Sequence, residues 1–230
     1  MGLDPQFADL DGDGNLDIVN GRYNPANIYW FPGLGTGKGF GARRVLLEAG
    51  KGDKYSMSTT NAADLDGDGD VDLVIGDTSG AVYQAKNEGS RTEPKFTSRA
   101  PIMVGDQPMK VSHKSDPIAV DWNGDGRLDI LVGDEVADVS FFAGLEGGGF
   151  APGVSLFSKL PVDPKDNYNK AKAKLDPHRV IAGYRLRLAT ADWNDDGKLD
   201  LLVGNCETAP KAEGEEHGKT IGHVYVLLRQ

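Results

Sequence analysis

Short apolar and alternating runs recur along the chain and predict β-strands. One run follows each of four acidic segments: DIV from Asp17, DLVI from Asp72, DILV from Asp129 and DLLV from Asp200. A second run comes a few residues later, as IYWF from Ile28, VYQA from Val82, VSFF from Val139 and VYVLL from Val224. The enrichment of β-branched and aromatic residues in these runs is typical of strands.

Two further short segments accompany the acidic segments. QFA from Gln6, TTNAA from Thr59, PIAV from Pro117 and LRLAT from Leu186 precede them. Phe40, Phe96 and Phe150 follow in Gly- or Pro-rich surroundings, and each leads into another short strand, such as RRVLL from Arg43. Each repeat is therefore expected to contain about four short strands.

The acidic segments themselves are copies of one motif that aligns without gaps. The copies are DLDGDGNLDIVNG from Asp9, DLDGDGDVDLVIG from Asp64, DWNGDGRLDILVG from Asp121 and DWNDDGKLDLLVG from Asp192, at intervals of 55, 57 and 71 residues. Acidic or amide residues occupy motif positions 1, 3, 5 and 9, glycine occupies positions 6 and 13, and apolar residues occupy positions 2 and 8. A recurrence of this length indicates a repeat architecture.

The repeat predicts an all-β fold, a β-propeller of four-stranded antiparallel blades, because each unit is too small to close its own core. The period is too long for a solenoid coil, and a sandwich would not repeat its register four times. We expect one domain over residues 1–230, with repeats at about 1–56, 57–113, 114–184 and 185–230. The ring is either four-bladed or an arc completed by a partner chain, which would make the protein a homo-oligomer.

Two segments interrupt the pattern. Residues 160–185 account for most of the longest interval, and NKAKAKL within them, residues 169–175, is expected to form a short helix. The stretch NCETAPKAEGEEHGKTIG from Asn205 is polar and rich in glycine, so a loop is expected there.

Composition and charge exclude several classes of protein. With 35 Asp and Glu against 25 Lys and Arg, the net charge of -10 opposes binding to nucleic acid and favours a cationic partner. No run approaches the roughly 20 apolar residues of a membrane helix, so no membrane insertion is expected. The single cysteine, Cys206, excludes an intramolecular disulfide and a cysteine-rich zinc site. No signal peptide is recognisable in MGLDPQFADL.

The acidic motif predicts four calcium sites, because carboxylates crowded into nine residues repel one another unless a cation neutralises them. Calcium takes six to eight oxygen ligands, which positions 1, 3, 5 and 9 supply through side chains and position 7 through its carbonyl. Glycine at position 6 permits the sharp turn. The predicted ligands are Asp9, Asp11, Asp13, Asn15 and Asp17; Asp64, Asp66, Asp68, Asp70 and Asp72; Asp121, Asn123, Asp125, Arg127 and Asp129; and Asp192, Asn194, Asp196, Lys198 and Asp200.

The third motif position predicts a ranking among the four sites. It is aspartate in the first two copies and asparagine in the last two, so the first two sites should bind calcium more tightly. An EF-hand is excluded because the twelfth position is Asn20, Ile75, Val132 or Val203 instead of glutamate, and a strand follows instead of a helix. Zinc and magnesium suit an all-oxygen, irregular set less well, and plain Asp-Gly turns without a metal are the remaining alternative.

DxDGDGxxD followed by a strand resembles the FG-GAP or VCBS repeats of integrin α-subunit propellers and of secreted bacterial proteins. The resemblance spans nearly the whole chain, whereas Phe40-Gly41 and Phe150-Ala151-Pro152 match the family's further elements only imperfectly. It implies that the acidic loop connects the first and second strands of a blade and that calcium is structural. It also implies that ligands bind to the opposite face of the propeller. Propellers of that family commonly have seven blades, whereas four repeats are visible in this sequence.

On this implied ligand face, several loop residues mix aromatic rings with cations, which suits an anionic glycan or an acidic protein segment. The candidate ligand-binding residues are Arg22, Tyr23, Tyr168, Lys172, His178 and Arg179, with Tyr184 beside them. Solvated loop residues without a ligand are the alternative. Trp122 and Trp193, at motif position 2, are expected to pack in the core.

The favoured function is a calcium-stabilised extracellular or periplasmic binding module for carbohydrate or protein ligands, in adhesion or recognition. One alternative is a polysaccharide lyase, in which His178, Lys172 and Tyr168 would abstract a proton beside a calcium-held uronate. Another is the structural propeller domain of a larger polysaccharide-active enzyme. No nucleophile elbow, P-loop or dinucleotide fingerprint is present, so an enzyme is the less favoured class and no catalytic residue is assigned.

Overall fold

The computed structural model describes residues 2–50, 58–135, 138–157, 184–208 and 220–229. These residues form strands and connecting loops, without a helix among them. A helical segment that could serve as a membrane span is therefore not found in the described ranges. The strands are β1 (Gly2–Ala8), β2 (Asp17–Arg22), β3 (Ile28–Phe31), β4 (Arg44–Leu47), β5 (Ser58–Ala63), β6 (Asp72–Asp77), β7 (Val82–Ala85), β8 (Ala100–Pro101), β9 (Met103–Val104), β10 (Gln107–Pro108), β11 (Asp116–Val120), β12 (Asp129–Gly133), β13 (Val139–Phe142), β14 (Val154–Ser155), β15 (Tyr184–Ala191), β16 (Asp200–Thr208) and β17 (Thr220–Leu227).

Each repeat folds into one antiparallel sheet whose strands are paired in sequence order. The sheets are β1-β2-β3-β4, β5-β6-β7-β8, β11-β12-β13-β14 and β15-β16-β17, and the small hairpin β9-β10 lies between the second and third sheets along the chain. The predicted strands are confirmed, with four strands in each of the first three repeats and three in the described part of the fourth, where about four were expected. Each sheet is therefore a meander, in which strands that are consecutive in the sequence pair with one another.

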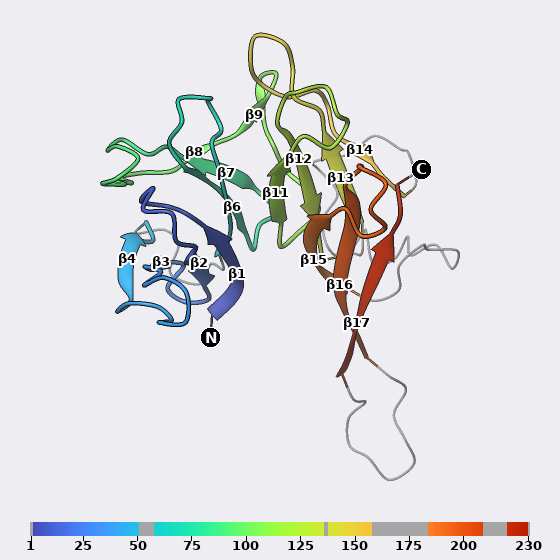
Figure 1. Cartoon of the computed structure of the whole chain (residues 1–230). Coiled ribbons are helices and arrows are strands. Elements are labelled where there is room, and N and C mark those ends of the chain that lie inside the picture. Colours follow the sequence, from blue (N-terminus) through green and yellow to red (C-terminus); the bar gives the residue numbers. More distant parts are fainter. Residues whose placement is uncertain (1, 51–57, 136–137, 158–183, 209–219, 230) are drawn as a thin grey trace.

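The four sheets are arranged around a common axis as the blades of a four-bladed β-propeller, as Figure 1 shows. The predicted fold class is thus confirmed. Consecutive blades are in extensive contact through their inner strands, β1 and β2 with β5, β5 and β6 with β11, and β11 and β12 with β15. In the described ranges the first and fourth blades have no contact of this extent, and Figure 1 shows them on the two sides of an open seam.

Consecutive blades bury one repeated register of side chains between them. Motif position 11 of one blade packs against positions 10 and 12 of the next: Val19 against Leu73 and Ile75, Val74 against Ile130 and Val132, and Leu131 against Leu201 and Val203. We call the face that carries position 11 the forward face and the face that carries positions 10 and 12 the backward face. Alternation of side chains along a strand places neighbouring motif positions on opposite faces.

Glycine at motif position 13 permits the inner strand of the next blade to approach closely. A Cβ atom at Gly21 would lie 1.9 Å from the carbonyl oxygen of Ser58, and one at Gly76 would lie 2.2 Å from that of Ser115. Both distances are far below van der Waals contact, so no other residue fits there. The sequence pattern showed this glycine, but only the packing of the blades explains it.

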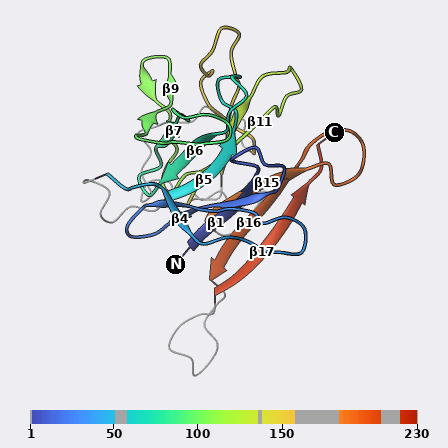
Figure 2. The ribbon, with the colours of Figure 1, turned by 60° about the vertical axis from the view of Figure 1, so that its left-hand side comes forward.

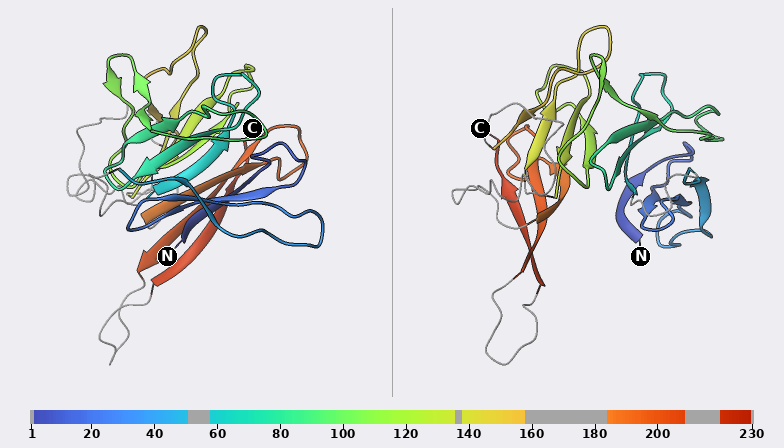
Figure 3. Two further views of the ribbon diagram at one scale, coloured as in Figure 1. Left: turned by 90° about the vertical axis from the view of Figure 1, so that its left-hand side faces the viewer. Right: turned by 180° about the vertical axis from the view of Figure 1, so that it is seen from behind.

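Two expectations from the sequence are wrong. The loop expected from Asn205 is shorter than predicted, because β16 continues to Thr208 and β17 begins at Thr220, with these two residues paired. This polar hairpin projects beyond the other blades (Figures 2 and 3). Trp193 does not pack in the core, since 62 % of it is exposed, whereas Trp122 is partly buried between the third and fourth blades. The reason is positional: Trp122 has a following blade to pack against, and in the described residues Trp193 has none.

Candidate functional site

The four acidic loops lie between the first and second strands of their blades, where the resemblance placed them. Each loop turns on glycines in the left-handed region, with φ of 85° at Gly14, 93° at Gly69 and 83° at both Gly126 and Gly197 at motif position 6. Position 4 is also left-handed and is glycine in three loops, but in the fourth loop it is Asp195 with φ of 58°. An L-residue resists this conformation, so the fourth loop carries local strain.

Backbone N–H groups fix the carboxylates at positions 1 and 5. In every loop the N–H of the position 6 glycine donates to the position 1 aspartate, over 3.2, 3.0, 2.9 and 2.9 Å in chain order. The N–H of position 7 donates to the position 5 aspartate, over 2.8, 2.9, 3.0 and 2.9 Å. These local bonds orient two carboxylates of each loop.

The position 9 aspartates are fully buried and clamp the loop to the blade. The Leu10 N–H donates to Asp17 Oδ2 over 3.0 Å, and the Gly33 N–H donates to Asp17 Oδ1 over 2.6 Å. Asp72, Asp129 and Asp200 accept equivalent bonds from the N–H of motif position 2 and from a backbone N–H just after the third strand. The sequence analysis predicted position 9 as a ligand and did not recognise this clamp, whose second donor lies 15 to 29 residues away.

In the first loop, three carboxylates point their oxygens toward one another. Asp9, Asp11 and Asp13 each offer a ligand oxygen within 4.8 Å of the others. Asp9 Oδ1 and Asp11 Oδ1 are buried and have no hydrogen-bond partner among the residues that the structure describes. Burial and then the negative charges of Asp17, Asp13 and Asp9 raise the pKa of Asp11. Unpartnered, desolvated oxygens of like charge are costly alone and are the donors that a hard cation prefers.

The second loop gathers Asp64, Asp66 and Asp72 within the same 4.8 Å, but a lysine already contacts it. Lys86 Nζ lies 2.8 Å from Asp66 Oδ2, and this hydrogen bond lowers the pKa of Asp66. Arg91 bridges the first two loops, with Nη2 3.5 Å from Asp9 Oδ2 and Nη1 donating to the Gly69 carbonyl over 3.1 Å. The sequence analysis missed both cations, because no motif position marks them and only the folding of the second blade brings them to the loops.

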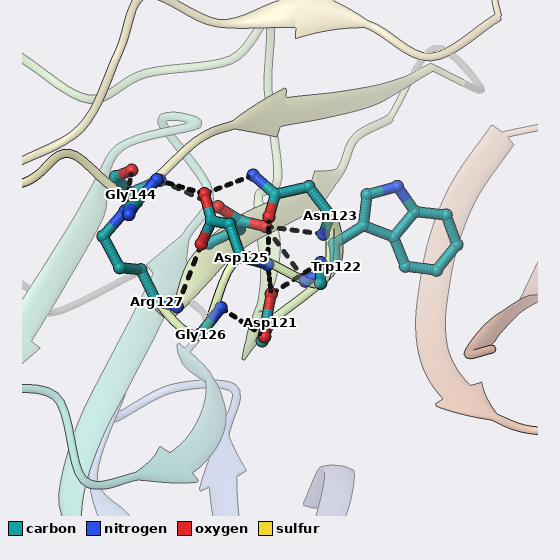
Figure 4. A network of polar contacts seen from close by, with 9 residues as sticks. Asp121, Trp122, Asn123, Asp125, Gly126, Arg127 and Gly144 are labelled. Carbon is teal, nitrogen blue, oxygen red and sulfur yellow. Dashed lines mark hydrogen bonds and ion pairs between the residues drawn. The ribbon is translucent and has the colours of Figure 1, made fainter. Parts of the chain in front are cut away.

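In the third and fourth loops, internal donors contact the carboxylates instead, as Figure 4 shows for the third loop. Asn123 Nδ2 donates to Asp125 Oδ2 over 2.9 Å, and the Arg127 guanidinium forms an ion pair with the same oxygen. Asn194 Nδ2 donates to Asp196 Oδ2 over 3.0 Å in the fourth loop. In the described part of the chain, three carboxylate oxygens come together only in the first two loops. This agrees in direction with the predicted ranking of the sites, which itself stays a prediction.

The opposite end of the blades carries a polar cluster around Glu135, which is almost fully buried. Lys114 Nζ donates to Glu135 Oε1 over 2.9 Å, and Arg185 Nε lies 3.5 Å from Glu135 Oε2. Lys114 and Arg185 both have left-handed backbones, with φ of 48° and 59°. Burial first, and then the charge of Lys114, lowers the pKa of the neighbouring His113. Strained, charged residues that meet where the second, third and fourth blades converge are typical of a recognition site.

The candidate ligand residues predicted from the sequence are only partly described. Arg22 ends β2 at the same end as Glu135, and Tyr23 follows it. Tyr23 is half exposed, and Arg22 Nη1 donates to Tyr29 Oη over 3.4 Å. The short helix expected at 169–175 lies outside the described residues, as do Tyr168, Lys172, His178 and Arg179. The lyase hypothesis rested on three of these residues and stays a prediction.

The fold and the loops together define a class, a β-propeller built from acidic-loop repeats. Comparison with curated protein sequences returns no match. A family model described as an FG-GAP-like repeat matches residues 9–75 and again residues 64–132, which together make up more than half of the chain. The chain belongs to the FG-GAP-like repeat family.

Proposed function

We propose that this protein is a calcium-stabilised recognition module that binds a carbohydrate or protein ligand outside the cell or in the periplasm. The propeller of FG-GAP-like repeats is consistent with a binding module. To this we add, as a proposal, the calcium ion, the face that binds the ligand and the location outside the cell or in the periplasm. The observation that carries it is the first acidic loop, in which Asp9 and Asp11 keep buried carboxylate oxygens without hydrogen-bond partners. Millimolar calcium outside the cell suits loops of this type.

Calcium would be held by the carboxylates at motif positions 1 and 5 and by the position 3 side chain, which is a carboxylate in the first two loops and an amide in the last two. In the second loop, Asp72 offers a further oxygen within 4.8 Å of those of Asp64 and Asp66. When bound, the ion supplies positive charge that neutralises the loop. The chain itself contributes the backbone N–H groups that orient the position 1 and position 5 carboxylates and the clamp that anchors the loop to the third strand. The ion is therefore structural, at the end of the propeller away from Glu135.

The ligand face is proposed at the Glu135 cluster. There, the single negative charge of Glu135 faces the two positive charges of Lys114 and Arg185, and Arg187 Nη1 lies 3.7 Å from the buried Asp116 Oδ1. Cationic donors that are only partly neutralised suit a ligand that offers carboxylate, hydroxyl or carbonyl oxygens. Side chains of Lys114 and Arg187 are partly exposed, and that of Arg185 is half exposed, so donors are available to such a ligand.

Thermal unfolding with calcium and with EDTA tests the proposed ion. We expect the melting temperature to fall in EDTA and to return when calcium is added back, because an ion that binds only the folded state stabilises it by about 2.7 kcal/mol at 100 times its dissociation constant. Magnesium at equal concentration should restore less. An unchanged melting temperature in EDTA would contradict the calcium proposal.

A glycan array and a set of acidic and neutral peptides, both probed in calcium, test the ligand face. Lys114→Ala and Arg185→Ala should remove binding but leave the difference in melting temperature between calcium and EDTA unchanged, since both residues lie at the other end of the blades from the acidic loops. Lys38→Ala, at an exposed loop residue away from the cluster, is the matched control. Binding that survives both cluster substitutions would show that the ligand binds at another place on the protein. Release of an unsaturated uronate from a bound polysaccharide would favour the lyase hypothesis.

A further inference from the structure

The forward face of the fourth blade has the residues of a blade interface but no blade against it in the described chain. The clearest position is the third-strand residue opposite the glycine at motif position 13. At this position Ile28, Val82 and Val139 are 1 %, 0 % and 0 % exposed, each covered by the following blade. The equivalent residue of the fourth blade, Val224, pairs with Gly204 and is 73 % exposed.

Other positions on the same face show the same contrast. At motif position 2, Leu10 is fully buried, and Leu65 and Trp122 are partly buried against the next blade, but Trp193 is 62 % exposed. Figure 4 shows the Trp122 ring pointing away from its own loop, toward strands of the fourth blade. At position 11, Val19, Val74 and Leu131 are fully buried, and Leu202 is only partly so.

Gly204 supports this interpretation from the backbone. In the first two blades the position 13 glycine is needed because the inner strand of the next blade lies against it. A Cβ atom at Gly204 would meet only Arg187, of its own blade, at 3.7 Å or more, so nothing in the described chain requires glycine there. The fourth blade therefore keeps the space for a following inner strand.

The backward face of the first blade is the other half of such a blade interface, and it is also uncovered in the described chain. Position 8 is Val71 in the second blade, where it packs against the first, but Leu16 in the first blade is 61 % exposed. Ile18 is partly exposed at position 10, where Leu73, Ile130 and Leu201 are buried. Phe7, opposite Ile18, is 60 % exposed and contacts Phe40 with a ring-centroid distance of 6.3 Å. Asn20, on this face at position 12, has a buried Oδ1 without a partner.

We propose that a second copy of this chain closes the propeller, with the forward face of each fourth blade packed on the backward face of the partner's first blade. One chain carries both halves of an interface that it already forms three times internally, so two copies related by a two-fold axis bury both open faces and leave none exposed. The result is a closed ring of eight blades, to which each chain contributes the four blades described above. Trp193 is a large exposed aromatic side chain on the forward face of the fourth blade, and side chains of this kind contribute strongly to such interfaces.

The test is the mass of the full chain in solution, by size-exclusion chromatography with light scattering at about 0.15 M ionic strength, where repulsion between two acidic chains is screened. The expected mass is twice the 24.6 kDa of the chain. The measurement is made with calcium and with EDTA, so that the assembly is read separately from the proposed ion. A monomer at micromolar concentration in both conditions, or an open series of larger assemblies, overturns the proposal.

Two substitutions locate the contact. Val224→Asp alters the fourth blade and Phe7→Asp alters the first, and each should raise the dissociation constant at least about 100-fold, because a buried unpaired charge replaces an apolar contact. Met103→Asp is the matched control, since Met103 is 42 % exposed on β9, away from both faces. Circular dichroism checks that each variant is folded, and Val224→Thr gives a milder second test.

Mixing the two variants distinguishes the proposed head-to-tail contact from a symmetric one. Neither variant dimerises alone, but a mixed pair has one seam with two intact faces and one seam with both substitutions. Mixing should therefore recover dimer, at lower affinity than the unaltered chain. No recovery on mixing, or a dimer that survives both substitutions, overturns the proposal.

Discussion

The first and fourth acidic loops share a motif but differ in what faces their carboxylates. In the first loop, Asp11 at position 3 adds a carboxylate, and buried oxygens of Asp9 and Asp11 have no partner. In the fourth loop, Asn194 donates to Asp196, and the loop satisfies part of its own charge. One atom at position 3, oxygen or nitrogen, thus separates a loop that gathers three carboxylates from a loop whose amide donates a hydrogen bond to one of its own carboxylates. The position 9 clamp is the same in both.

The clamp should give the largest effect and no difference between the loops. Asp17→Ala and Asp200→Ala each remove two hydrogen bonds to a fully buried carboxylate, so each should lower the free energy of unfolding by about 3 kcal/mol. Chemical denaturation in EDTA measures this without a contribution from metal. Asp106→Ala, at an exposed residue, is the control and should change stability by less than about 0.5 kcal/mol. A large difference between the two variants would show that the clamps are not equivalent.

Exchanging position 3 should interchange the affinities of the loops. Asn194→Asp should tighten calcium binding at the fourth loop by about tenfold, and Asp11→Asn should weaken binding at the first by a similar factor, because ligand charge tunes affinity. Titration calorimetry is made in backgrounds where the position 5 aspartates of the other three loops are asparagine. Unchanged affinity after both exchanges would mean that position 3 is not a ligand.

In EDTA, replacing one aspartate by asparagine should change the free energy of unfolding in opposite directions in the two loops, and both changes should disappear at low pH. The raised pKa of Asp11 means that its charged form costs stability at neutral pH, so Asp11→Asn should stabilise the metal-free protein at pH 7. This gain disappears as falling pH protonates Asp11. The N–H of Lys198 and then the Asn194 amide lower the pKa of Asp196, so Asp196→Asn should destabilise at pH 7, and the loss disappears on acidification. Denaturation at several pH values measures both, and equal signs would contradict the comparison.

The smallest expected effect concerns the turn itself. Asp195→Gly removes an L-residue from a left-handed conformation and should stabilise the fourth loop by about 0.5 kcal/mol, after the entropy cost of glycine. Gly124→Asp, at the same position of the third loop, should destabilise by a similar amount. Thermal unfolding of both variants checks the pair. A loss of stability on Asp195→Gly would show that the Asp195 side chain stabilises the loop.

Much of the fold could be predicted from the sequence, because repeat and strand signals are local. The motif placed the acidic loop before its strand, and alternation placed IYWF and VSFF on β3 and β13. The site was harder to predict. Lys86, Arg91 and the second clamp donor Gly33 are distant in sequence from the loops they contact, so no spacing reveals them.

Residue types at fixed, short spacings specified the four oxygen-rich loops and the strands around them, because these features are local in the chain. The packing of the blades, by contrast, sets which carboxylates act as clamps, which cations reach the loops and where Val224 and Trp193 are left uncovered. Exposure depends on whether another blade lies against a face. Motif position 2 is apolar in every repeat, so its residue type does not reveal whether that blade is present.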